Sequence, residues 1–463
     1  MANEAFVVLM LLACTLWADY TYTPHNASTP RRESRPVLVR ESKPPPMKLT
    51  SGMRRLPAGR LIIAGSILAL SACTAATHQP GAVSEVRIGL LGRFADPGGG
   101  TGQEASRGAQ LAAEIINQTA SVPVPLAGAG LPGLGGAKIR IVQADTRGAP
   151  EQPAIQATRL ATQQGVAGIV SVDNATSTAL ASERTERIGV PFMGAVATAD
   201  FLTERGLDWF FRTTPTDSML AQAGVGVLGQ RESAVHSIGV VQANDDASNE
   251  ALTALQGQAG QAGASVLRPA AFDPEKGAGD ARSAINRVRG GNPDTVVAVA
   301  SEPGAARTLL TAEASAGGQP PVSLAMGSGF TVNTIRQAAQ TTTGLLHTTA
   351  WSQDFASRNP AASAVANLYQ RRFNTPMTEA AAETFTATMT LAQAIDAARS
   401  VDAQRVRTAL LSLDVPGRDT IMPWGGIRFD QTGENTLAAG LVEQVTATSA
   451  RVVFPRELAA ANT

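Results

Sequence analysis

The sequence predicts an α/β fold of two Rossmann-like lobes, each a parallel sheet covered by helices, with the chain crossing between them. Short runs of β-branched and aliphatic residues alternate with longer stretches of helical periodicity along most of the 463 residues. The second observation is a pair of strand signals in residues 188–217, which read IGVPFMGAVATADFLTERGLDWFFRTTPTD. Small residues follow one buried strand there, and the next strand ends in Thr-Thr-Pro, which is typical of a chain leaving one sheet for another.

The first half of the chain contains five strand signals separated by helical ones. Each strand signal is a short apolar run that ends at a glycine, an aspartate or a turn, and each helical segment buries small or aliphatic residues on one side. Asp217 is expected to cap the helix that follows the last of these strands. Strands are predicted at 86–91, 138–144, 166–172, 189–194 and 209–211, and helices at 103–117, 154–164 and 173–187.

The second half repeats the alternation and then becomes mainly helical. The pattern indicates another parallel sheet with helices on both faces. Strands are predicted at 237–242, 264–267, 295–300, 322–326 and 344–349, and helices at 222–231, 247–261, 279–289, 305–316, 361–373, 380–399 and 405–412.

Composition and motifs argue against several classes of protein. The 38 basic residues balance the 38 acidic ones, so no net field favours nucleic acid. The four histidines are scattered, and neither HExxH, CxxC nor GxSxG occurs, so metal and triad chemistry have no local motif. A literal GxGxxG at 128–133 contains a proline and follows no strand, which makes it a chance match. We therefore expect no enzyme, no cofactor and no metal site.

The front of the chain carries targeting signals. Residues 53–73, MRRLPAGRLIIAGSILALSAC, combine a basic start, an apolar segment and Leu-Ser-Ala-Cys, which resembles a bacterial lipobox with lipidation at Cys73. A short hydrophobic helix with an incidental cysteine is the alternative. Residues 74–84 form a polar tether, and 1–52 are either an extension upstream of a true start at Met53 or a disordered leader.

The segment VPFMGAVATADFLTERGLDWFFRTTPTDS resembles the signature of periplasmic binding proteins of the leucine/isoleucine/valine-binding type. The likeness extends from about residue 86 to residue 430. It implies a type I periplasmic binding protein fold, whose two lobes are joined by three hinge crossings around a ligand cleft. Lobe 1 would comprise 85–214 and 345–422, and lobe 2 would comprise 215–344 and 423–455.

The resemblance also implies a ligand site at the ends of two first-lobe strands. The helix start that holds a ligand carboxylate in this family matches Ala175, with Thr176 and Ser177 beside it. The threonine that touches carboxylate and ammonium matches Thr198, and the carbonyl that accepts from the ammonium matches Val196. Free N–H groups and the helix dipole suit an anion at such a corner, although plain capping would explain one of its polar side chains.

Other ligand positions depart from the family pattern. The aromatic residue of the first loop falls near Thr101, and the second-lobe tyrosine falls on Ala247. The acidic residue that pairs with the ammonium falls at Gly329, where no carboxylate exists. Asp246 or its neighbour Asp245 is a candidate replacement, and a capping role is the alternative for that pair.

The resemblance implies an extracytoplasmic lipoprotein that captures a small polar ligand, an amino acid or an amide-like compound, for an ABC importer. Its partners would be the ligand, the permease and ATPase subunits, and the membrane through the N-terminal lipid, without nucleic acid. The alternative is a sensor or adaptor lipoprotein of the same fold that regulates a protein partner.

Overall fold

The computed structural model describes residues 83–95, 100–118, 121–128, 130–230, 234–338 and 342–459. They belong to one compact unit, residues 76–463. The expected signal peptide, Cys73 and all but the last two residues of the tether lie outside the described residues. No helix in the ranges just given is both long and apolar enough to cross a membrane.

The first sheet has five strands in the order β2-β1-β3-β4-β5, and every neighbouring pair is parallel. All five strands were predicted, and the parallel α/β architecture is confirmed. This order places the carboxyl ends of β3 and β4 side by side, where the predicted ligand corner begins. The strands are β1 (Glu85–Gly92), β2 (Lys138–Asp145), β3 (Gly168–Ser171), β4 (Phe192–Gly194) and β5 (Phe210–Arg212).

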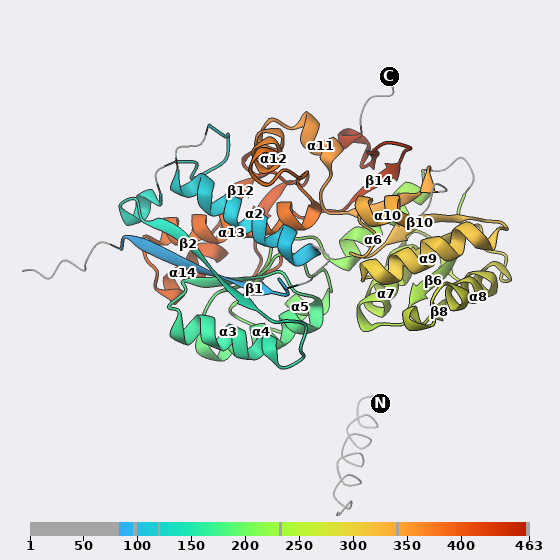
Figure 1. Cartoon of the computed structure of the whole chain (residues 1–463), viewed down its shortest axis with the longest axis horizontal. Coiled ribbons are helices and arrows are strands. Elements are labelled where there is room, and N and C mark those ends of the chain that lie inside the picture. The colour runs from blue at the N-terminus through green and yellow to red at the C-terminus, as the bar shows by residue number, and fades with distance from the viewer. Residues whose placement is uncertain are drawn as a thin grey trace, which may run out of the picture. The chain divides into compact units, whose positions relative to one another are not determined.

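Helices cover both faces of this sheet (Figure 1). Alternate strand residues point to opposite faces, so Val170 packs with α2 and α13 while Ile169 packs with α3 and α4. α2 and α13, which are far apart in the sequence, pack closely together, with the Gly108 backbone against that of Ala381. The helices are α2 (Thr101–Asn117), α3 (Gln152–Gln163), α4 (Ala175–Ile188), α5 (Phe201–Glu204), α11 (Gln353–Arg358), α12 (Pro360–Phe373), α13 (Glu379–Ala398) and α14 (Ala403–Leu411).

The second sheet follows the order β15-β14-β11-β10-β9-β6-β7, with β8 also paired to β6. Its parallel part was predicted, but β8 and the two antiparallel strands β14 and β15 were not. The fold is therefore mixed at this edge. The strands are β6 (Ser237–Ala243), β7 (Ser265–Val266), β8 (Ala270–Phe272), β9 (Thr295–Val299), β10 (Val322–Met326), β11 (Leu346–Thr349), β14 (Leu441–Val445) and β15 (Ala450–Phe454).

The second sheet also has helices on both faces. Val297 and Val299 pack toward α6 and α7, whereas Val296 and Ala298 pack toward α8 and α9. The prediction that Asp217 caps α6 was wrong, because the Thr216 hydroxyl accepts from the Met219 N–H and Asp217 is the first helical residue. The helices are α6 (Asp217–Leu228), α7 (Asp246–Gln261), α8 (Ala278–Arg289), α9 (Pro303–Ala316) and α10 (Val332–Ala338).

Three segments connect the two sheets. Residues 213–216 lead from β5 to α6, residues 350–352 lead from β11 to α11, and residues 429–440 lead from β13 (Gly426–Arg428) to β14. The sequence assigned 345–349 to the first lobe, but β11 is hydrogen-bonded between β10 and β14. It assigned 423–428 to the second lobe, yet β13 pairs with β12 (Asp414–Pro416), and Ile427 packs in the first-lobe core.

Candidate functional site

The start of α4 is shaped to receive an anion. Asn174 caps the helix through its side-chain oxygen, which accepts from the Ser177 N–H at 2.9 Å. Thr178 is buried and hydrogen-bonds the Ser171 hydroxyl at 3.0 Å. The N–H groups of Ala175 and Thr176 donate to no other described residue, and the Thr176 side chain is exposed. Two free donors at the positive end of a helix dipole are therefore available to a ligand.

Thr198 lies between the two lobes. Its carbonyl accepts from the Asp217 N–H at 2.8 Å, and its side chain hydrogen-bonds the Asp217 carboxyl group. Asp200, two residues later, accepts from the Ser218 N–H at 3.2 Å. The first-lobe corner is thus joined to the first turn of α6 by three hydrogen bonds.

A group of carboxyl side chains lies on the second-lobe side of this corner. Burial raises the pKa of Asp217 to about 6, with Asp200 adding to the effect and the Thr198 hydrogen bond opposing it. Burial also raises the pKa of Glu250 to about 7, and the charges of Asp217, Asp246 and Asp200 raise it further. One Glu250 oxygen is buried and has no hydrogen-bond partner among the described residues. These groups make the second-lobe side of the corner attractive to a cation.

Sequence reasoning missed Glu250 and the buried position of Asp217. Glu250 follows Asp246 by four residues on α7, which places the two side chains on one helix face. That spacing was a usable signal. Nothing in the sequence, however, shows that α7 packs against α6 and brings Glu250 close to Asp217.

The remaining predicted site residues come from several elements. Thr101 is the exposed first residue of α2, and Ala247 lies in the first turn of α7 with no aromatic group to offer. Val196 is partly buried against the first-lobe core, and its carbonyl accepts from no described residue. Asp246 is exposed on α7. The Gly329 N–H is already bonded to the Ala300 carbonyl at 3.1 Å.

The alternative that the sequence left open for Asp245 is resolved. Asp245 caps α7, since its carboxylate accepts from the Ser248 N–H at 2.8 Å and from the Ser248 hydroxyl at 2.9 Å. Arg93, after β1, lies 3.9 Å from the Glu302 carboxylate of the second lobe, and both side chains are about half exposed. An exposed pair at that distance contributes little to stability.

A buried ion pair fixes the first and third crossings beside the site. Arg212 is fully buried, and its guanidinium pairs with the Glu434 carboxylate and donates to the Thr203 hydroxyl at 3.1 Å. Asn435 is also fully buried and donates to the Thr213 carbonyl at 3.1 Å. β5, the neighbour of the strand that leads into the Thr198 corner, is therefore held against the returning chain by charge and by hydrogen bonds.

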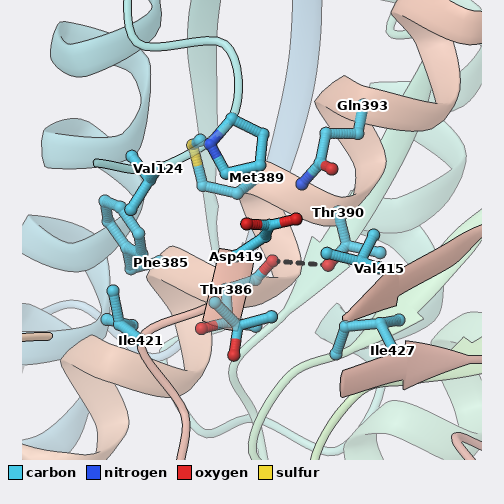
Figure 2. A pocket seen from close by; sticks show the side chains of 12 residues that line it. Val124, Phe385, Thr386, Met389, Thr390, Gln393, Val415, Asp419, Ile421 and Ile427 are labelled. Atoms are coloured by element: carbon cyan, nitrogen blue, oxygen red, sulfur yellow. Dashed lines mark hydrogen bonds between the residues drawn. The ribbon is translucent and has the colours of Figure 1, made fainter. Parts of the chain in front are cut away.

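A small cavity lies away from this corner, between α13 and the β12–β13 hairpin (Figure 2). Its volume is about 10 Å³, and Thr386, whose hydroxyl has no partner among the described residues, is one of its lining side chains. That space fits one water molecule and no organic ligand. The cavity includes none of the residues assigned to the ligand site, so it belongs to the first-lobe core.

Comparison with known proteins identifies the family of the chain. Residues 85–448 match the family model described as "Periplasmic binding protein". The chain belongs to the periplasmic binding protein family. A curated relative, Leu/Ile/Val-binding protein homolog 7 from Brucella abortus (strain 2308), is 24% identical over 389 residues, which cover 81% of this chain and 92% of the relative.

Solved structures show the same two-lobed fold. An ABC transporter substrate-binding protein from Desulfitobacterium hafniense, in complex with Leu, aligns with a TM-score of 0.64 at 21% identity, covering 80% of this chain and 100% of that chain. A solute-binding protein of an ABC transporter from R. palustris, in complex with benzoate, has a TM-score of 0.64 at 15% identity, covering 80% and 95%. Since whole relatives correspond to the compact unit of this binding protein, we treat residues 84–463 as an independent folding unit.

Proposed function

We propose that the protein is an extracytoplasmic solute-binding lipoprotein of an ABC importer. It captures a small polar ligand, an amino acid or an amide-like compound, between two closing lobes and releases it chemically unchanged. Family membership supports this role. So do a relative named as a Leu/Ile/Val-binding protein homolog and two similar structures that contain leucine or benzoate. Each of those ligands carries a carboxylate in its bound or free form.

The observation that supports an amino acid most directly is the opposition of charge across the Thr198 corner. The α4 start offers two free N–H groups from the first lobe, and the second lobe offers the carboxyl groups of Asp217 and Glu250. A zwitterion satisfies both sides, because its carboxylate suits the helix N-terminus and its ammonium suits the acids. In this proposal Ala175, Thr176 and Ser177 bind the carboxylate.

The ammonium would then be held by three groups. The Thr198 hydroxyl and the Val196 carbonyl accept from it, and Glu250 supplies the negative charge that the sequence does not provide at Gly329. A buried ammonium needs such a partner, since an isolated charge in a closed cleft is costly. Thr101, Asp246 and Ala247 would line the rest of the cleft without an aromatic wall.

The location and partners follow from the front of the chain. We propose cleavage before Cys73, a diacylglycerol on its sulfur, and a tether over 74–84 that holds the domain at the cell envelope near its permease and ATPase. A mass spectrum of the purified mature protein checks this, because its first peptide should begin at lipid-modified Cys73. A peptide from 18–50 in that protein would contradict both the anchor and the start at Met53.

The first test is thermal unfolding of residues 84–463 with leucine, other amino acids, amides, urea, small carboxylates and sugars. A ligand at about 100 times its Kd adds roughly 2.7 kcal/mol to the unfolding free energy, which gives a clear rise in melting temperature. Thr198→Ala should weaken binding about tenfold to a hundredfold, since it removes a hydroxyl that bonds charged groups.

Thr162→Ala is the matched control, because this threonine is exposed on α3, away from the corner. It should bind as the wild type does. A well-folded domain that responds to no compound in the panel would overturn the receptor proposal and favour the sensor or adaptor function.

Glu250→Gln tests the ammonium site separately. We expect about tenfold weaker leucine binding and no loss for 4-methylpentanoate, which has the carboxylate and side chain of leucine but no ammonium. Leucine affinity of the wild type should rise about tenfold from pH 6 to pH 8, because Glu250, with a pKa of about 7, must lose its proton to pair with the ammonium. Isothermal titration calorimetry across that range measures both effects.

The rise with pH should disappear in the Glu250→Gln variant. Equal loss for leucine and 4-methylpentanoate would show that the residue acts on the shape of the cleft and not on the ammonium.

A further inference from the structure

Four ionisable side chains are gathered where the first and second crossings meet the start of α13. His347 on β11 and Glu443 on β14 are directly opposite in the antiparallel ladder, and their Nε2 and Oε2 atoms are 3.1 Å apart. Both side chains are almost completely buried. Glu379 and Glu383 lie one turn apart on α13. We call His347, Glu379, Glu383 and Glu443 the hinge cluster.

Each carboxyl group of the hinge cluster accepts a hydrogen bond from a crossing or its flank. Glu383 accepts from the Thr214 hydroxyl of the first crossing. Glu379 accepts from the Ala350 N–H of the second crossing, and Glu443 accepts from the Ser352 hydroxyl at its end. The cluster therefore joins a first-lobe helix, two crossings and two second-lobe strands.

The cluster holds three carboxyl groups and one imidazole. Among the described residues, its one contact between a basic and an acidic side chain is that of His347 with Glu443, which is an ion pair only when the imidazole is protonated. Glu104 of α2 hydrogen-bonds Thr378, the residue that caps α13, and Arg107 of the same helix interacts with Glu104. The Asp354 carboxylate of α11 forms an ion pair with the Arg358 guanidinium, and the Oδ2 and Nη2 atoms are 2.7 Å apart. No arginine or lysine in the described part of the chain forms an ion pair with Glu379 or Glu383.

Burial is the main cause that raises the pKa of Glu379. The nearby Glu443 carboxyl group raises that pKa further, and His347 lowers it. Burial and the neighbouring Glu379 raise the pKa of Glu383 well above its ordinary value. Such groups keep their protons in the packed hinge and release them where the hinge becomes hydrated. The packed arrangement is therefore fully favoured below the ordinary glutamate pKa of about 4.3 and loses that advantage as the pH rises toward the raised values.

We propose that the hinge cluster couples lobe movement to pH: the crossings stay packed while Glu379 and Glu383 hold protons, and deprotonation loosens them. The first proton to leave places an unpaired charge between the crossings, and the second places two like charges there, so water must enter to solvate and separate them. The coupling changes the ratio of loosened to packed hinge by up to about tenfold per pH unit for each proton released. This device is independent of which ligand the cleft binds.

The test is a fluorescence energy-transfer distance between the lobes, measured without ligand from pH 5 to pH 9. Both cysteines of the chain precede residue 84, so residues 84–463 accept a label pair at Leu180→Cys on α4 and Gln256→Cys on α7, two exposed positions. The wild-type distance should change with pH. The double variant Glu379→Gln/Glu383→Gln should keep its pH 5 distance throughout, and Glu183→Gln, an exposed control on α4, should follow the wild type.

A wild-type distance that does not vary with pH overturns the proposal. So does a pH dependence that survives in the double variant or that Glu250→Gln abolishes instead. If the double variant fails to fold, hydrogen exchange of the Ala350 amide in the wild type tests the pH coupling instead. Its protection factor should fall as the pH rises, and a constant protection factor contradicts the coupling.

Discussion

Replacing Glu434 by alanine should lower the unfolding free energy by about 3–5 kcal/mol, because it leaves the Arg212 guanidinium buried without its counter-ion. The loss should be large for a single side chain, since Arg212 lies between the first-sheet edge and the third crossing and no water reaches it. Urea denaturation of residues 84–463, followed by circular dichroism, should show a lower midpoint with an unchanged slope.

The double variant Arg212→Met/Glu434→Leu separates the pair from the unpaired charge. We expect it to recover most of the lost stability, because apolar residues of similar volume replace a buried ion pair at little cost. A double variant as unstable as Glu434→Ala would mean that the loss comes from packing or from the Thr203 hydrogen bond.

Gly108→Ala should lower the unfolding free energy by about 2–3 kcal/mol, although alanine is ordinarily the better helix former. A Cβ at Gly108 would lie 2.1 Å from the Ala381 carbonyl oxygen, so α2 and α13 would have to move apart. The three atoms nearest to that Cβ all belong to the Ala381 backbone, which cannot turn aside as a side chain could. The same urea experiment measures the loss.

Gly257→Ala is the matched control within the same molecule. Gly257 lies inside α7, and a Cβ there would meet no atom within 4 Å. This change should stabilise the domain by about 0.5–1 kcal/mol through helix propensity. A loss at both glycines would show that the close approach of α2 and α13 is not the cause.

The sequence predicted the strands and helices well wherever a single periodicity dominates a segment. Residues 296–299 are wholly apolar and lie in a buried strand, and 103–117 bury one face of α2, so local pattern and tertiary burial agree. β8 and β14 were not predicted, because each is defined by pairing with a strand distant in the sequence, β8 with β6 and β14 with β11. The cap of α6 was mispredicted for a different, local reason, because two neighbouring residues, Thr216 and Asp217, can both cap a helix.

The candidate site was predictable only where backbone supplies it. The α4 start and the Thr198 corner follow from strand ends and small residues, which a sequence displays. Glu250 did not follow, since its importance depends on the packing of α6 against α7. Gly329 illustrates the opposite case, because the sequence already shows that no carboxylate can come from that position.

The pairing of α2 with α13 has a consequence for how the chain is made. The first sheet is complete in the sequence at Arg212, but the helix that covers one of its faces ends only at Ala398. At roughly 5–20 residues per second, a ribosome needs about 10–40 seconds to bridge that interval. Throughout that time the apolar side of β1, β3 and β4 has α2 but lacks α13, so its cover is incomplete. We expect the nascent first lobe to rely on a chaperone or export machinery until the last third of the protein emerges.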